Sequence, residues 1–181
     1  MNNTISMVIG SWGSYNECNE RALGIKWLDL SDYSSWEEIE EELKNEGFEL
    51  EGIDEELFIQ DIEGMPENSE NWDYVHLKEI FELIKSSGVL DDEYKYDLMQ
   101  AYCEAASFDE WAERVRFHDD DWDSDLILYR NRDMEDVAYE LMHEIYEIPD
   151  CLENYIDYSR FAQDLSFDGY TETSKGVLQV I

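Results

Sequence analysis

The sequence predicts an α+β protein built in three parts, and this prediction rests on two observations. Short runs rich in β-branched and apolar residues stand near both ends of the chain, whereas the middle shows only helical periodicity. Apolar residues make up 43% and aromatic residues 14% of the 181 residues, and disordered acidic chains lack such groups. We therefore expect a folded core beneath a highly charged surface.

The first part, residues 1–64, is expected to form a small sheet with one helix. The predicted strands cover residues 4–9, 24–30 and 57–62, and the predicted helix covers residues 35–45. Ser35 and Glu38 have the spacing of a capping box, and Trp36, Ile39 and Leu43 form an apolar stripe on the same helix.

The second part, residues 65–118, is expected to be helical. It begins in a polar stretch, residues 64–73, that we interpret as a linker. Apolar residues recur with helical spacing from residue 77 to 84, and Gly88 supplies a stop. A second stripe runs from residue 94 to 105. Ser107 and Glu110 then have the spacing of another capping box, which predicts a third helix.

The third part, residues 119–181, is expected to mix strands and helices. A strand is predicted at residues 126–129 and a helix at 134–145. Pro149 is expected to open a further helix that ends near Gly169, because proline suits the first turn. Two short strands, 170–173 and 177–181, are predicted to close the chain around a Ser-Lys-Gly turn.

The charge of the chain is extreme and evenly spread. The chain has 47 acidic and 12 basic residues, a net charge of −35. The three parts hold 17, 13 and 17 acids against 3, 5 and 4 bases. An acidic tail would concentrate its charge at one end, so this distribution indicates a coat over folded elements. Such a surface repels nucleic acid and anionic membranes and attracts basic surfaces.

No motif for catalysis or metal binding is recognisable. The run Asp121, Asp123, Asp125 fails as a calcium loop, because its sixth and twelfth positions are Leu126 and Arg132 rather than glycine and a carboxylate. Paired carboxylates, as in glycosidases, arise by chance among 47 acids. The histidines are isolated in sequence, and no nucleophile motif or phosphate-binding loop is present. We predict no enzymatic activity, no metal and no cofactor.

The cysteines and the hydropathy give an expected location. Cys18, Cys103 and Cys151 fit neither a disulfide framework nor a zinc spacing, so we interpret them as buried, reduced thiols. The sequence shows no signal-peptide pattern and no apolar run of about 18 residues. A cytoplasmic protein is expected.

The charge is therefore the functional signal that remains. B-form DNA carries one negative charge per about 1.7 Å of its axis, so 35 charges correspond to about 60 Å, or about 17 base pairs. A rigid array of carboxylates can attract a DNA-binding enzyme in the same way. Two alternatives stay open: an acidic module for another basic partner, such as a histone-like protein, and a solvated or salt-adapted surface without a partner.

Three stretches carry a resemblance to a known family. They are GSYNECNERALGIKWLDL (13–30), FIQDIEG (58–64) and IPDCLENYIDYSRFAQDL (148–165), the last followed by FDGYTETSKGVLQVI. Together they resemble the ArdA antirestriction family over nearly the whole chain. The resemblance implies an elongated three-part α+β protein that dimerises through its C-terminal part. It also implies mimicry of bent B-form DNA and inhibition of type I restriction–modification enzymes.

The expected interface with that partner is distributed along the chain. The expected contacts are Glu37, Glu38, Glu41, Glu42, Asp91, Asp92, Asp119, Asp120, Asp121, Asp123, Asp136, Glu140, Glu144, Asp150, Glu153, Asp157 and Asp164. The resemblance assigns the last four, which lie in its C-terminal acid-rich stretch. Val177, Leu178, Val180 and Ile181 are the expected dimer interface, because these four residues are apolar and the stretch 173–181 has no Asp or Glu.

Overall fold

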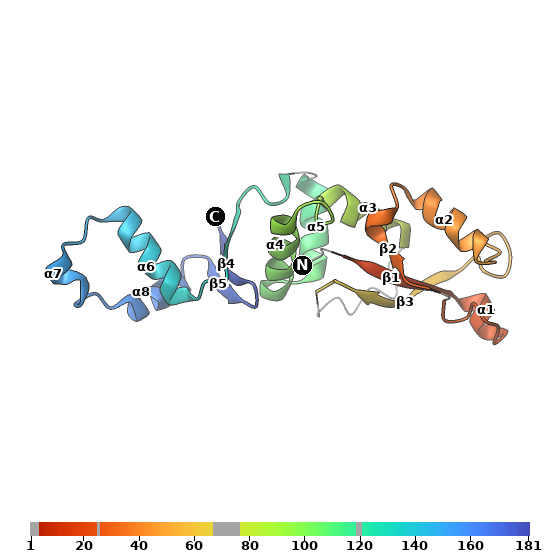
Figure 1. Cartoon of the computed structure of the whole chain (residues 1–181), viewed down its shortest axis with the longest axis horizontal. Helices are drawn as coiled ribbons and strands as arrows, with labels where there is room; N and C mark the ends of the chain where they lie inside the picture. Colours follow the sequence, from red (N-terminus) through yellow and green to blue (C-terminus); the bar gives the residue numbers. More distant parts are fainter. Residues whose placement is uncertain (1–3, 25, 67–76, 119–120) are drawn as a thin grey trace.

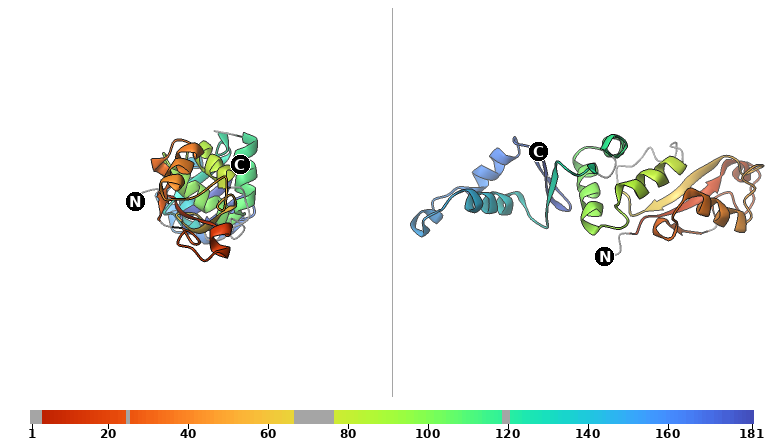
Figure 2. Two further views of the ribbon diagram at one scale, coloured as in Figure 1. Left: turned by 90° about the vertical axis from the view of Figure 1, so that its right-hand side faces the viewer. Right: turned by 90° about the horizontal axis from the view of Figure 1, so that it is seen from above.

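The computed structural model describes residues 4–24, 26–66, 77–118 and 121–181. Within them, helices combine with two three-stranded antiparallel sheets, which confirms the predicted α+β class. The elements are arranged along a single long axis, with the N-terminal sheet at one end and α7 (Asp150–Glu153) at the other (Figure 1). Seen along that axis, the molecule is narrow (Figure 2). The body is therefore elongated.

The first sheet has the strand order β2-β1-β3. Strand β1 (Ser6–Ser11) pairs with β3 (Leu57–Glu63), with a register shift between Val8 and Ile9. Helix α2 (Trp36–Asn45) packs the predicted stripe of Trp36, Ile39 and Leu43 into the core. The sequence therefore predicted both long strands and this helix correctly, to within two residues.

Two local predictions in this region were wrong. The strand expected at 24–30 shrinks to β2 (Leu28–Asp29), because Gly24 takes a left-handed conformation (φ 79°) in a turn and the Asp29 carboxylate accepts the Ser31 N–H to start a 3-10 turn at Leu30–Asp32. Ser35 makes no side-chain cap on α2. Instead, the Glu38 carboxylate accepts the backbone N–H of Ser34.

The middle of the chain is helical, as expected. It contains α3 (Leu77–Ser87), α4 (Glu93–Ala105) and α5 (Phe108–His118), and Gly88 ends α3 with φ 74°. The Ser107 hydroxyl accepts the N–H of Glu110, which confirms the predicted cap. The linker expected at 64–73 lies mostly outside the described residues.

The second sheet has the strand order β4-β6-β5, so the last strand of the chain lies in its centre. Strand β6 (Gly176–Val180) pairs with β4 (Leu126–Arg130) and with β5 (Tyr170–Thr173). Helices α6 (Met134–Ile145) and α8 (Tyr158–Leu165) pack against each other beside this sheet. The single helix expected after Pro149 is instead the short α7 followed by α8, because the Asp157 carboxylate caps α8 by accepting the Arg160 N–H.

Two hydrophobic cores hold these elements. The first runs from the N-terminal sheet through the middle helices to Leu128 and Leu178 of the second sheet. The second is small and joins α6, α8 and the other face of that sheet, including Val177. The first core contains residues from all three predicted parts, 1–64, 65–118 and 119–181, so it crosses the boundaries proposed at residues 64 and 118. The division into three domains stays a prediction from the sequence.

Candidate interaction surface

The surface is negative because acidic residues outnumber basic ones by 47 to 12, and most of the basic residues lie in ion pairs. Nine of the 12 lysines and arginines form ion pairs with carboxylates among the described residues. These nine are Arg21, Lys26, Lys78, Lys95, Arg114, Arg116, Arg130, Arg132 and Lys175. Exposed pairs contribute little to stability. They do keep these cations beside carboxylates and so leave the excess acids to determine the charge that a partner meets.

Helix α2 carries the first group of expected contacts, and its four acids differ. Glu41 is exposed. Glu37 is exposed but binds Lys78 at 3.2 Å. A hydrogen bond with its own backbone holds the pKa of Glu37 below its ordinary value, and the hydrogen bond from Lys78 lowers this pKa further. Glu42 is only half-exposed and pairs with Lys26, which lowers its pKa. Glu38 and Glu41 are therefore the exposed acids of this face that form no ion pair among the described residues.

A buried tryptophan lies between two of the expected acids, Asp121 and Asp123. Trp122 is fully buried, its indole N–H donates to the carbonyl of Ser87 at 2.9 Å, and its ring lies 6.0 Å from that of Trp111. This anchor keeps the exposed Asp121 at the surface, while Asp123 pairs with Lys95 at 3.5 Å.

Four further expected contacts belong to this middle region. Asp91 is exposed, and Asp92 is exposed but caps α4 through the N–H groups of Tyr94 and Lys95. Asp119 and Asp120 lie outside the described residues.

The C-terminal acids surround α6, α7 and α8. The exposed members of the expected set are Asp136, Glu144, Asp150, Asp157 and Asp164. Glu140 is half-buried and pairs with Arg132 at 2.8 Å. Glu153 accepts hydrogen bonds from Tyr158 at 2.9 Å and lies 3.2 Å from His143. Local desolvation and this bond raise the pKa of Tyr158 to about 12, so Glu153 serves the fold as well as the surface.

The expected dimer residues divide into two pairs. Val177 and Leu178 are buried within the chain itself, on opposite faces of β6, so neither is available to a second subunit. Their assignment as contact residues is therefore wrong, because β6 is a central strand covered on both faces. Val180 and Ile181 remain exposed.

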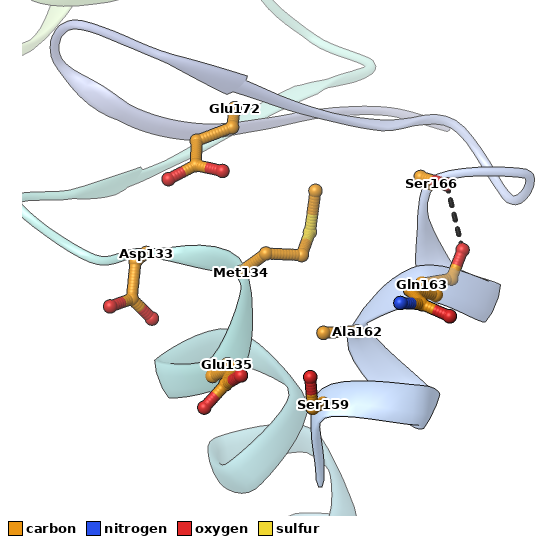
Figure 3. A pocket seen from close by; sticks show the side chains of 8 residues that line it. All are labelled: Asp133, Met134, Glu135, Ser159, Ala162, Gln163, Ser166 and Glu172. Carbon is orange, nitrogen blue, oxygen red and sulfur yellow. Dashed lines mark hydrogen bonds between the residues drawn. The ribbon is translucent and has the colours of Figure 1, made fainter.

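A hollow of about 440 Å³ lies between α6, α8 and β5 (Figure 3). Its lining residues are Asp133, Met134, Glu135, Ser159, Ala162, Gln163, Ser166 and Glu172. Met134 extends across it toward the sheet, with Glu172 above and Ala162 opposite. The three carboxylates give it the same charge as the rest of the surface.

The sequence reasoning missed a buried carboxylate at the N-terminal end. Asp54 is fully buried and accepts hydrogen bonds from the Ser14 hydroxyl and, at 2.9 Å, from the Glu49 N–H. Arg21 lies 3.3 Å away. Burial acts to raise the pKa of Asp54, but these hydrogen bonds and the Arg21 charge outweigh it and hold the pKa below its ordinary value. No spacing in the sequence singles out this one acid among 47.

Among the described residues, no group of three or more His, Cys, Asp or Glu side chains could hold a metal ion, and no helix is long and apolar enough to cross a membrane. Cys103 is buried, and burial raises the pKa of its thiol, but Cys18 and Cys151 are exposed. The expectation of three buried thiols was therefore wrong for two of them, since both lie in surface turns or short helices rather than on apolar stripes.

Comparison with known proteins supplies a family. The family model described as antirestriction protein (ArdA) matches residues 7–179 of the 181. A search of curated proteins finds no match to the chain.

Proposed function

Because the chain belongs to the ArdA antirestriction family, we propose that it inhibits type I restriction–modification enzymes by occupying their DNA-binding groove as a DNA mimic. The observation that carries this proposal is the combination of a net charge of −35 with an elongated body along which the acids are spread. An alternative is an acidic module for another basic partner, such as a histone-like protein. Membership of the ArdA family favours a restriction–modification enzyme as the partner over a histone-like protein.

The physical basis is the response of a DNA-binding groove to charge. Such grooves gain much of their affinity when lysines and arginines replace the counterions of phosphate. A folded body that holds exposed carboxylates in fixed positions presents the groove with the same kind of surface, and it loses less conformational entropy on binding than a disordered acidic tail. Inhibition then follows from exclusion of DNA. It requires no reaction and no cofactor, and the proposal places the chain in the cytoplasm.

Many carboxylates share the binding in this proposal. The exposed acids of α2, Asp91, Asp121 and the acids around α6 to α8 lie on elements that follow one another along the long axis (Figure 1). Each exposed charge pair contributes only about 0–1 kcal/mol. The affinity therefore depends on the number of contacts, and no single acid is indispensable.

A homodimer is the proposed assembly. Val180 and Ile181 are exposed apolar side chains at the C-terminus, where a second copy would cover them. The exposed apolar residues Ile145, Tyr146, Leu152 and Tyr155 lie in the same third of the chain. A two-fold arrangement of two acidic bodies would extend the mimic to about 35 base pairs.

Inhibition by the purified chain tests the proposed function. A type I enzyme is assayed for cleavage of unmodified DNA at increasing chain concentrations, and a type II enzyme on the same DNA is the control. We expect the type I enzyme to be inhibited while the type II enzyme is not. Capture of histone-like proteins from a lysate, with no effect on the type I enzyme, would favour the alternative.

A further inference from the structure

A cluster of exposed aromatic side chains lies at the N-terminal end of the body, apart from the acidic faces described above. Trp12 and Tyr15, both in α1 (Trp12–Asn16), are 44% and 49% exposed, and Leu23 is 52% exposed. The Trp12 ring stacks on the buried Phe58 at 4.3 Å and meets the Tyr15 ring edge-on at 5.7 Å. Tyr15 and Leu23 line one shallow hollow. The three exposed side chains are thus contiguous, and we call them the aromatic tip.

The aromatic tip stands on a rigid base. The Trp12 N–H donates to the carbonyl of Glu56 at 2.9 Å, and a Cβ at Gly13 would lie 1.7 Å from the carbonyl oxygen of Ile53, so α1 sits directly on the turn that precedes β3. The buried Asp54 joins the same turn to α1 through Ser14. Rings fixed in this way lose little freedom when a partner covers them.

The charge around the aromatic tip limits what can cover it. Exposed acidic residues lie next to it in the chain, beside α1 and in the turn before β3 that Trp12 contacts. They are Glu17, Glu20, Glu55 and Glu56. Glu20 lines the hollow of Tyr15 and Leu23, while the nearby cation Arg21 is engaged by Asp54. A second tip, a nucleic acid and an anionic membrane would each be repelled by these acids. The occupant must therefore carry positive charge and also tolerate contact with aromatic faces.

We infer that the aromatic tip binds arginine side chains of the partner's basic DNA-binding surface, with the guanidinium planes stacked on Trp12 and Tyr15 and paired with the neighbouring carboxylates. Arginine fits better than lysine, because its planar guanidinium stacks on aromatic rings and is less strongly hydrated than an ammonium group. This inference rests on the proposed function and adds a contact that the phosphate backbone of DNA does not offer. The stacking contributes an attraction to the complex, and added salt weakens this attraction less than it weakens the ion pairs with carboxylates.

The chemistry of the aromatic tip can be tested without the enzyme. The full chain is titrated with an arginine hexapeptide and with a lysine hexapeptide of equal charge at about 0.15 M salt. We expect the arginine peptide to bind about two- to fivefold more tightly for each ring contact. Tyr15→Leu should remove one of the two ring contacts and so reduce this preference about two- to fivefold, whereas the control Phe167→Leu, a ring that is 86% exposed in the C-terminal third, should retain it. Equal affinities for the two peptides, or an unchanged preference in Tyr15→Leu, would overturn the inference.

The same variants then separate this inference from the proposed function. With a type I enzyme, Tyr15→Leu should weaken inhibition several-fold, and the relative loss should grow as salt rises. A wild-type chain that does not inhibit the enzyme overturns the proposed function. A wild-type chain that inhibits, with Tyr15→Leu equal to it at every salt concentration, overturns only the role of the aromatic tip. Equal urea midpoints for the two chains exclude an effect on folding.

Discussion

Removal of the Asp54 carboxylate should destabilise the protein far more than removal of any neighbouring acid. In Asp54→Ala, the Ser14 hydroxyl, which is fully buried, and the Glu49 N–H lose their acceptor, and Arg21 loses its partner. A hydrogen bond to a charged group contributes about 1.5–3 kcal/mol, and relief from burying the carboxylate offsets part of the sum. We expect the free energy of unfolding to fall by about 3 kcal/mol, a large share of the 5–15 kcal/mol typical of folded proteins.

Urea unfolding followed by tryptophan fluorescence measures this change, with Glu55→Ala as the matched control. Glu55 is the exposed neighbour of Asp54, and its substitution should change stability by less than about 0.5 kcal/mol. If Asp54→Ala loses less than about 1 kcal/mol, the network around Asp54 does not stabilise the N-terminal end as we describe.

The stability difference between wild type and Asp54→Ala should also depend on pH, in a direction that the pKa of Asp54 sets. The folded protein holds the pKa of Asp54 below its ordinary value of 3.8, so the charged carboxylate stabilises the fold at neutral pH. The stability difference between wild type and Asp54→Ala should be full above pH of about 4 and should shrink as the pH falls through the lower, folded pKa. A difference that stays constant down to pH of about 2 would mean that the pKa of Asp54 is not the origin of the effect.

Three further predictions concern the surface and the assembly. Glu41→Gln should change inhibition little, whereas the combined replacement of Glu37, Glu38, Glu41 and Glu42 by Gln should weaken it several-fold in the cleavage assay; a single substitution that abolishes inhibition would indicate a localised site. Ile181→Asp should convert a dimer into a folded monomer in light scattering, and a wild-type chain that is monomeric at micromolar concentration would refute the dimer. Glu153→Gln should lower the pKa of Tyr158 from about 12, because it removes the negative charge that accepts the hydrogen bond of the phenol and repels the phenolate; ultraviolet titration against wild type measures this shift.

A substitution at Ile181 tests the dimer better than a deletion of the C-terminal residues. Deletion of residues 176–181 removes β6, the central strand of the second sheet, so its expected result is an unfolded C-terminal part. Ile181 follows β6 and is 74% exposed, so its substitution tests the interface without removing a strand.

The sequence predicted the long helices well, because each has a complete apolar stripe. The stripe from Met134 to Ile145 gave the limits of α6 without error, and Gly88 gave the end of α3. Short elements were missed where hydrogen bonds of polar side chains, and not an apolar stripe, determine the local backbone conformation. α1 was not predicted, because its five residues carry no repeat, and the chain turns after β2 because Asp29 caps the next turn.

The candidate surface was predictable in its charge but not in its details. Composition gave the net charge, yet it could not show that Glu42 is paired with Lys26 or that Glu153 binds Tyr158, since both depend on contacts between separate elements. Val177 and Leu178 were misassigned for a related reason. An apolar chain end suggests an edge strand, whereas the pairing of β6 with both β4 and β5 puts these residues in two cores.

Competition between the chain and duplex DNA for one type I enzyme tests the DNA-mimic proposal most directly. The affinity of the chain is measured with and without excess duplex that contains the recognition site, at salt concentrations from about 50 to about 200 mM. If the chain occupies the DNA-binding groove, the duplex displaces it completely, and the logarithm of its affinity falls linearly with the logarithm of salt concentration. A ternary complex of enzyme, DNA and chain, or an affinity that does not change with salt, would contradict the account.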